Sequence, residues 1–134
     1  MAWDEANTTC SDMGGGLVVP NSEDEHQFIW KMFERNVQEG NVWIGCTDMD
    51  EEDKWIQAGG GGQECSYFNW APGEPNQHSG HEEDCVWMWH ESSGLWNDAE
   101  CSRAAFVICE FSAGRSPGLE VFCLQANANG RFKF

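Results

Sequence analysis

The chain is poor in basic residues. Lysine and arginine number 7 against 23 aspartates and glutamates in 134 residues, which gives a formal net charge of −16. Because contacts to phosphate need clustered Lys and Arg, this deficit argues against a nucleic-acid partner and against an anionic membrane surface. No apolar run is long enough to span a membrane, so we expect no membrane insertion. Excess carboxylate usually coats a solvated surface, but it also suits a site for a cation.

Closely spaced, metal-binding cysteines are also absent. None of the 7 cysteines lies in a CxxC pair or at a zinc-like Cys/His spacing. Widely spaced cysteines in one small domain indicate disulfides formed in an oxidising compartment. Seven is odd, so at least one is free or pairs outside the chain, and Cys123 could link two chains of an oligomer. The sequon Asn7-Thr8-Thr9 agrees with a secreted or extracellular protein. No secretory signal is visible, which indicates a fragment without its signal.

The hydrophobic pattern predicts two helices followed by short strands, which is an α+β order. Apolar or small residues at helical spacing predict a helix over residues 3–13. A capping box of Ser22 and Glu25 starts a second helix that runs to about Asn36. Its inner face is expected to consist of Phe28, Ile29, Met32 and Phe33. Strand-like runs occupy residues 17–19, 42–46, 54–56, 85–89, 94–97, 105–109, 121–124 and 131–134.

Periodicity disappears over residues 58–84, and so long an irregular stretch inside a compact domain is usually functional. Calcium takes about six to eight oxygen ligands, preferably from carboxylates and amide carbonyls. Such oxygens are carried here by Glu74, Asn76, Glu83, Asn97 and Asp98. We therefore predict one calcium ion between Glu74-Pro75-Asn76 and Trp96-Asn97-Asp98, with coordination positions left open for neighbouring hydroxyls of a ligand. Eight tryptophans exceed the need of a small core, so we also expect one or two to face a ligand.

Five segments, taken together and in order, resemble the C-type lectin-like domain. They are Trp43-Ile44-Gly45, residues 69–76, Glu83-Asp84-Cys85-Val86, residues 96–101 and residues 106–110. The resemblance assigns residues 1–110 to a C-type lectin-like fold, with two helices packed on small antiparallel sheets and a long calcium-binding loop. It implies two disulfides, which join Cys10 to Cys109 and Cys85 to Cys101. Either a third bridge joins Cys46 to Cys65, or Cys46 is a small buried apolar residue.

The resemblance also implies roles for the predicted calcium ligands. In such domains the ion and the sugar share the same side chains, here Glu74, Asn76, Glu83, Asn97 and Asp98, and the carbonyl oxygen of Asp98 also binds the ion. A residue at the position of His78 often contacts the sugar, and Pro75 is cis. The Glu-then-Asn order across this proline implies mannose, fucose or N-acetylglucosamine, whereas Gln-then-Asp goes with galactose. A second, auxiliary calcium would lie at Asp48, Glu52 and Asp84 beside Glu83; the alternative is a solvated acidic turn.

The expected function is therefore calcium-dependent carbohydrate binding. The alternative is a lectin-like domain that binds a protein or ice without recognising sugar. An enzyme is not expected: Glu74 and Glu83 could imitate a glycosidase pair, but as metal ligands they would be held deprotonated. Trp70 and Trp96 are expected to pack in the core beside the loop.

The tail departs from the family pattern. Such domains begin with a strand before the first helix, whereas this chain begins at the helix. Residues 111–134 form a C-terminal extension, and residues 129–134 look like the missing strand moved to the other end. We expect a circular permutation or a tail that returns to the sheet edge; the alternative is a disordered extension.

Overall fold

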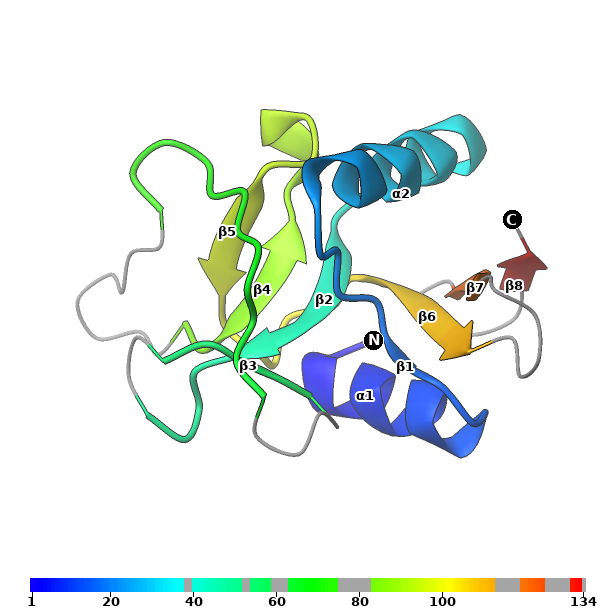
Figure 1. The fold of residues 1–134 in the computed structure, drawn as a ribbon, viewed down its shortest axis with the longest axis horizontal. Coiled ribbons are helices and arrows are strands. Elements are labelled where there is room, and N and C mark those ends of the chain that lie inside the picture. Colours follow the sequence, from blue (N-terminus) through cyan, green and yellow to red (C-terminus); the bar gives the residue numbers. More distant parts are fainter. Residues whose placement is uncertain are drawn as a thin grey trace.

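The computed structural model describes residues 1–37, 40–51, 54–58, 63–74, 83–112, 119–124 and 131–133 (Figure 1). Asn76, Pro75, His78 and Glu52 lie outside these residues. The fold is α+β, as predicted. Its elements are α1 (Trp3–Asp12), β1 (Gly16–Leu17), α2 (Glu23–Asn36), β2 (Val42–Thr47), β3 (Ile56–Gln57), β4 (Cys85–Met88), the short 3₁₀ helix η1 (His90–Ser92), β5 (Trp96–Ala99), β6 (Phe106–Ser112), β7 (Leu119–Leu124) and β8 (Arg131–Lys133).

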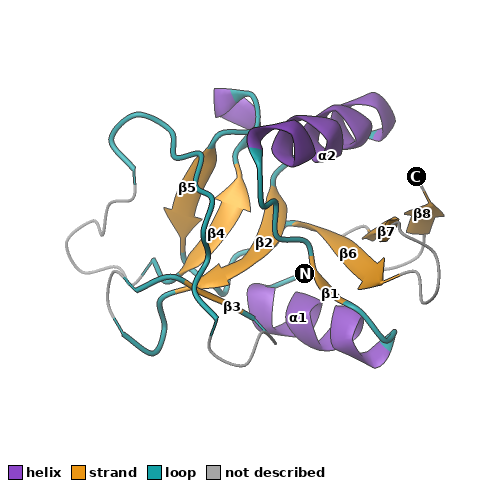
Figure 2. Ribbon diagram, in the orientation of Figure 1, coloured by secondary structure: helices purple, strands orange, loops and turns teal. Residues whose placement is uncertain are grey.

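The strands form one mixed sheet in the order β5-β4-β2-β6-β7-β8, with β1 added on β6 and β3 on β2. The pairings are antiparallel except between β2 and β6, where Val42 lies opposite Phe106 and Trp43 opposite Val107 in a parallel register. Figure 2 shows the described loop segments that follow β2 and β3 beside β3, β4 and β5, at the end of the sheet away from β7 and β8.

The helices cover opposite faces of this sheet (Figure 1). Side chains alternate along a strand, so β2 serves both faces: Val42 and Ile44 pack in the core beneath α2, and Trp43 packs in the core beneath α1. The same alternation separates Val86 from Trp87 in β4.

Helix α2 begins as predicted, because the Ser22 hydroxyl accepts a hydrogen bond from the Glu25 N–H at 3.1 Å. The prediction for its inner face was partly wrong, since Phe28 is 58% exposed. The buried stripe runs through His26, Ile29, Trp30 and Phe33, which is the i, i+3, i+4, i+7 pattern of one helical face. Phe28 lies about 100° around the helix from Ile29, outside the centre of that stripe.

Three disulfides tie these layers together. Cys10–Cys109 joins α1 to β6, and Cys85–Cys101 joins the start of β4 to the residues after β5, as the resemblance implies. Cys46 is not a lone buried thiol, because it is bridged to Cys65. That third bridge ties β2 to the loop segment after β3.

The C-terminal extension contributes two strands. β7 pairs with β6 from Val107↔Leu124 to Ser112↔Leu119, and β8 pairs with the far side of β7. Residues 119–124 therefore lie next to β6, and residues 131–133 lie one strand farther out.

Candidate functional site

The segment that leads to Glu74 is anchored on β5. The Trp96 N–H donates to the Asn69 carbonyl at 2.8 Å, and the Ala71 N–H donates to the Trp96 carbonyl at 2.8 Å. Trp70 and Trp96 thereby form a parallel β-bridge. A turn follows, in which the Glu74 N–H donates to the Ala71 carbonyl at 3.0 Å. These bonds fix the loop segment to β5, the strand that carries Asn97 and Asp98. Glu74 is hydrogen-bonded to Ala71, which is itself hydrogen-bonded to that strand.

The acidic segment before β4 reaches the same part of the sheet. In the β4–β5 ladder, Val86 lies opposite Asp98 and Cys85 lies opposite Ala99. Glu83 and Asp84 directly precede Cys85, whose disulfide to Cys101 holds the two strands together. The structure therefore collects three segments of the predicted ligand set around β5, whereas Asn76 and His78 are outside the described residues.

The predicted ligands differ in burial. Asp98 is 0% exposed, while Glu74, Glu83 and Asn97 are half-buried. An ionised carboxylate is costly to bury unless hydrogen bonds or a cation compensate its charge. Carboxylate and amide oxygens without sulfur or imidazole ligands suit calcium rather than zinc, so the donor types fit. Within the described residues, no three His, Cys, Asp or Glu side chains form a group that could hold a metal ion.

The predicted auxiliary residues are partly brought together. The Asp48 N–H donates to the Asp84 carbonyl at 3.1 Å, and the Thr47 hydroxyl donates to the same oxygen at 2.7 Å. Asp48 is buried and Asp84 is half-buried. Glu52 lies outside the described part of the chain, so the structure places only Asp48 and Asp84 of this predicted set.

A buried histidine, which the sequence reasoning missed, positions the loop segment. His26 is 1% exposed; its Nε2 lies 2.8 Å from the Gly94 carbonyl and its Nδ1 lies 3.1 Å from the Asn69 amide nitrogen. This geometry fits an Nε2–H that donates to the Gly94 carbonyl and an Nδ1 that accepts from the Asn69 NH2 group. Its place three residues before Ile29 on the buried stripe of α2 was the available signal.

A second contact fixes the same segment to α2. The Tyr67 hydroxyl donates to the Glu23 carboxylate at 2.5 Å. Burial of the phenol, together with this acidic neighbour, raises the pKa of Tyr67, and the same hydrogen bond lowers the pKa of Glu23. Tyr67 therefore remains a hydroxyl donor at physiological pH. With His26 it holds residues 67–69 against the helix.

The two tryptophans assigned to the core differ. Trp96 is fully buried, as predicted, and its ring meets that of Trp70 edge to face at 6.0 Å. Trp70 is only half-buried and lines a cavity. In the described part of the chain, no helix has the length and apolar character needed to cross a membrane.

Comparison with known proteins gives consistent results. The family model described as "Lectin C-type domain" matches residues 1–111. The hepatic lectin of chicken (Gallus gallus) is 34% identical over 110 residues, which cover 82% of this chain and 50% of that protein. The chain thus spans half the length of this relative.

Two solved structures are also similar. The C-type carbohydrate-recognition domain of cow CD23, determined in the presence of GlcNAc2Man3 oligosaccharide, is 36% identical with a TM-score of 0.66, over 78% of this chain and 74% of that one. A calcium-independent type II antifreeze protein is 28% identical with a TM-score of 0.68, over 81% of this chain and 77% of that one.

Proposed function

This chain belongs to the C-type lectin domain family, and from that premise we propose that it is a calcium-dependent lectin for mannose-, fucose- or N-acetylglucosamine-type glycans. The observation that carries the proposal is the β-bridge between Trp70 and Trp96. It joins the segment ending in Glu74 to the strand that begins Trp96-Asn97-Asp98. A repurposed domain would have no need to keep all five oxygen ligands.

In this proposal, the calcium ion accepts two adjacent hydroxyl oxygens of the sugar in coordination positions that the protein leaves open. Glu74 and Glu83 accept the hydroxyl protons in hydrogen bonds, and the amide groups of Asn76 and Asn97 donate to the hydroxyl oxygens. Every hydrogen-bonding group of the diol then has a partner, which offsets the hydrogen bonds to water that the sugar loses on binding. Because few atoms are buried, a single sugar should bind weakly, at roughly millimolar concentration.

The amide and carboxylate order across Pro75 gives the sharpest test. We expect the double variant Glu74→Gln/Asn76→Asp to change the preferred ligand from mannose to galactose, because it reverses donors and acceptors around the bound diol. A glycan array with and without calcium measures this change. Glu91→Gln, an exposed carboxylate on η1, is the matched control and should leave the array pattern unchanged. Galactose binding by the unaltered chain, or no calcium dependence, would contradict the proposal.

The second candidate is a lectin-like domain that binds a protein or ice without sugar. The observation that favours this candidate is the similarity to a calcium-independent antifreeze protein. Binding to immobilised mannan separates the two functions: competition by EDTA and by free mannose supports the lectin, and mannan binding should be absent if the alternative is right.

The proposal also covers the compartment of the protein and its clustering. Three disulfides favour an oxidising compartment, so we infer a secreted or extracellular domain. We propose no enzymatic activity, because Glu74 and Glu83 as calcium ligands would be held deprotonated. An auxiliary calcium at Asp48, Glu52 and Asp84 belongs to this proposal. Weak single-site affinity would make clustering in an oligomer useful, because linked sites gain avidity.

A further inference from the structure

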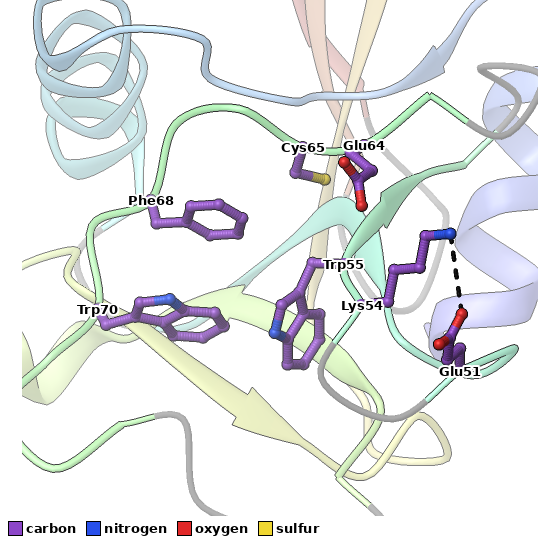
Figure 3. Close-up of a pocket in the computed structure, with 7 residues that line it drawn as sticks. All are labelled: Glu51, Lys54, Trp55, Glu64, Cys65, Phe68 and Trp70. Atoms are coloured by element: carbon purple, nitrogen blue, oxygen red, sulfur yellow. Dashed lines mark ion pairs between the residues drawn. The ribbon is translucent and has the colours of Figure 1, made fainter.

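A cavity of about 560 Å³ lies beside the loop segment, outside the predicted calcium ligands. This volume falls within the range of small-molecule sites. Figure 3 shows its lining, with the side chains of Phe68 and Trp70 extending toward Trp55. The lining residues are Glu51, Lys54, Trp55, Glu64, Cys65, Phe68 and Trp70.

Aromatic rings form one wall of the cavity. Phe68 and Trp70 are stacked with centroids 5.9 Å apart and planes 13° apart. Trp55 is tilted by 56° against Trp70 at 5.2 Å, which adds a second wall. Phe68 is 39% exposed, so part of this apolar surface faces solvent. A flat aromatic surface with an angled neighbour fits the C–H face of a saturated ring-shaped ligand.

This wall is held in place at both ends. Cys65 is bridged to Cys46, and its N–H donates to the Trp55 carbonyl at 2.9 Å. At the other end, Trp70 forms its bridge to Trp96. A partly exposed aromatic pair on an anchored segment is preorganised, so a ligand need not bear the cost of ordering it.

The rim of the cavity is polar. The Lys54 ammonium lies 3.7 Å from the Glu51 carboxylate, and Glu64 is exposed beside them (Figure 3). These groups offer both hydrogen-bond donors and acceptors next to the aromatic surface. A lipid chain has no use for such a rim. A sugar matches it, because a pyranose ring combines an apolar face with an edge of hydroxyls.

We propose that this cavity is a second saccharide subsite, independent of calcium, which takes one pyranose ring of a glycan whose terminal sugar binds the calcium site. The link to the terminal sugar rests on the proposed function; the subsite itself rests on the cavity. Trp70 pairs with Trp96, the residue before Asn97, and bridged strands lie about 4.8 Å apart. The proposal requires that one oligosaccharide span both sites, so that binding at each site raises the effective concentration at the other.

The test compares one sugar with three. Calorimetry in calcium should find that the protein binds mannotriose about three- to tenfold more tightly than methyl mannoside, the gain expected of one added aromatic contact. Phe68→Ala should remove this gain and leave methyl mannoside binding unchanged, whereas Phe68→Trp should retain the gain. Phe28→Ala removes an equally apolar, exposed ring from α2 and is the matched control. An unchanged preference for mannotriose in Phe68→Ala would overturn the subsite.

A second arm separates the subsite from the calcium site. In EDTA, mannotriose at high millimolar concentration should still change the tryptophan fluorescence of the protein, because Trp55 and Trp70 line the cavity. Phe68→Ala should lose that change. If neither sugar binds in a calcium-dependent way but the EDTA-resistant change remains, the proposed function fails and the subsite stands. If EDTA abolishes every fluorescence change, the subsite fails.

Discussion

At the scale of single residues, the predicted ligands and the residue that supports the loop differ in what the sequence reveals of them. Glu74, Glu83, Asn97 and Asp98 could be predicted as ligands from the sequence because they belong to a specific ordered pattern. His26 was not, because a histidine on an apolar helix face is usually a satisfied core residue and its partners, Asn69 and Gly94, are far away in the chain. Only the folded chain brings these groups together.

His26 should therefore matter for stability rather than for sugar contact. His26→Ala leaves the buried Gly94 carbonyl and Asn69 amide without their partner, and we expect a loss of about 2–4 kcal/mol in the free energy of unfolding. Urea denaturation measures it, with exposed Phe28→Ala on the same helix as the control. A loss below that of the control would show that the contacts contribute nothing.

Asp98 should couple stability to calcium. Calcium is expected to raise the melting temperature of the unaltered protein, and Asp98→Asn should remove most of that rise because the buried carboxylate becomes a neutral amide. Thermal unfolding with and without calcium measures this effect; an undiminished calcium response would remove Asp98 from the predicted ligand set.

At the scale of elements, the strands were largely predictable and their pairing was not. Apolar runs at residues 42–46 and 105–109 indicated strands, but nothing local indicates that β2 and β6 are parallel. That register depends on the whole chain path around the sheet. The Cys46–Cys65 bridge was undecided for the same reason, since spacing alone does not fix which cysteines meet.

Strand β6 carries a group that should respond to pH. Burial raises the pKa of Glu110 from 4.5 to about 7; the charge of Glu25 adds to this, and the hydrogen bond that the carboxylate accepts from the Val19 N–H opposes it. The folded state thus holds the proton to higher pH than the unfolded state. The resulting stabilisation is complete below about pH 4.5 and is lost as pH rises through about 7.

Glu110→Gln should flatten this dependence. The amide cannot ionise but can still accept from the Val19 N–H, so we expect the variant to exceed the unaltered protein by about 1–2 kcal/mol at pH 8 and to match it near pH 5. Urea denaturation at the two pH values measures the difference. Glu34→Gln, an exposed carboxylate on α2, is the control. Equal pH dependence in Glu110→Gln and the unaltered protein would contradict the argument.

At the scale of the whole molecule, the C-terminal extension completes one side of the sheet. We propose that β7 and β8 take the place of the strand that such domains carry before their first helix. Pairing of β7 along β6 supports this proposal. The sequence reasoning chose residues 129–134 as the missing strand, whereas residues 119–124 pair with β6 and residues 131–133 pair with β7, because a local pattern does not fix which run meets β6.

Removing residues 113–134 tests the role of the tail. It would expose the backbone donors and acceptors of β6, and an unpaired edge favours association with other chains. We expect a lower free energy of unfolding and self-association, measured by urea denaturation and size-exclusion chromatography. If the truncated chain stays monomeric and equally stable, the extension is not needed for either property.

The disulfide between Cys10 and Cys109 closes a loop around almost the entire lectin domain. A single peptide-bond scission anywhere between Cys65 and Cys85 would leave two fragments that remain covalently joined, because each fragment keeps one half of this cystine. A nicked molecule would therefore keep its mass on a non-reducing gel and separate only after reduction.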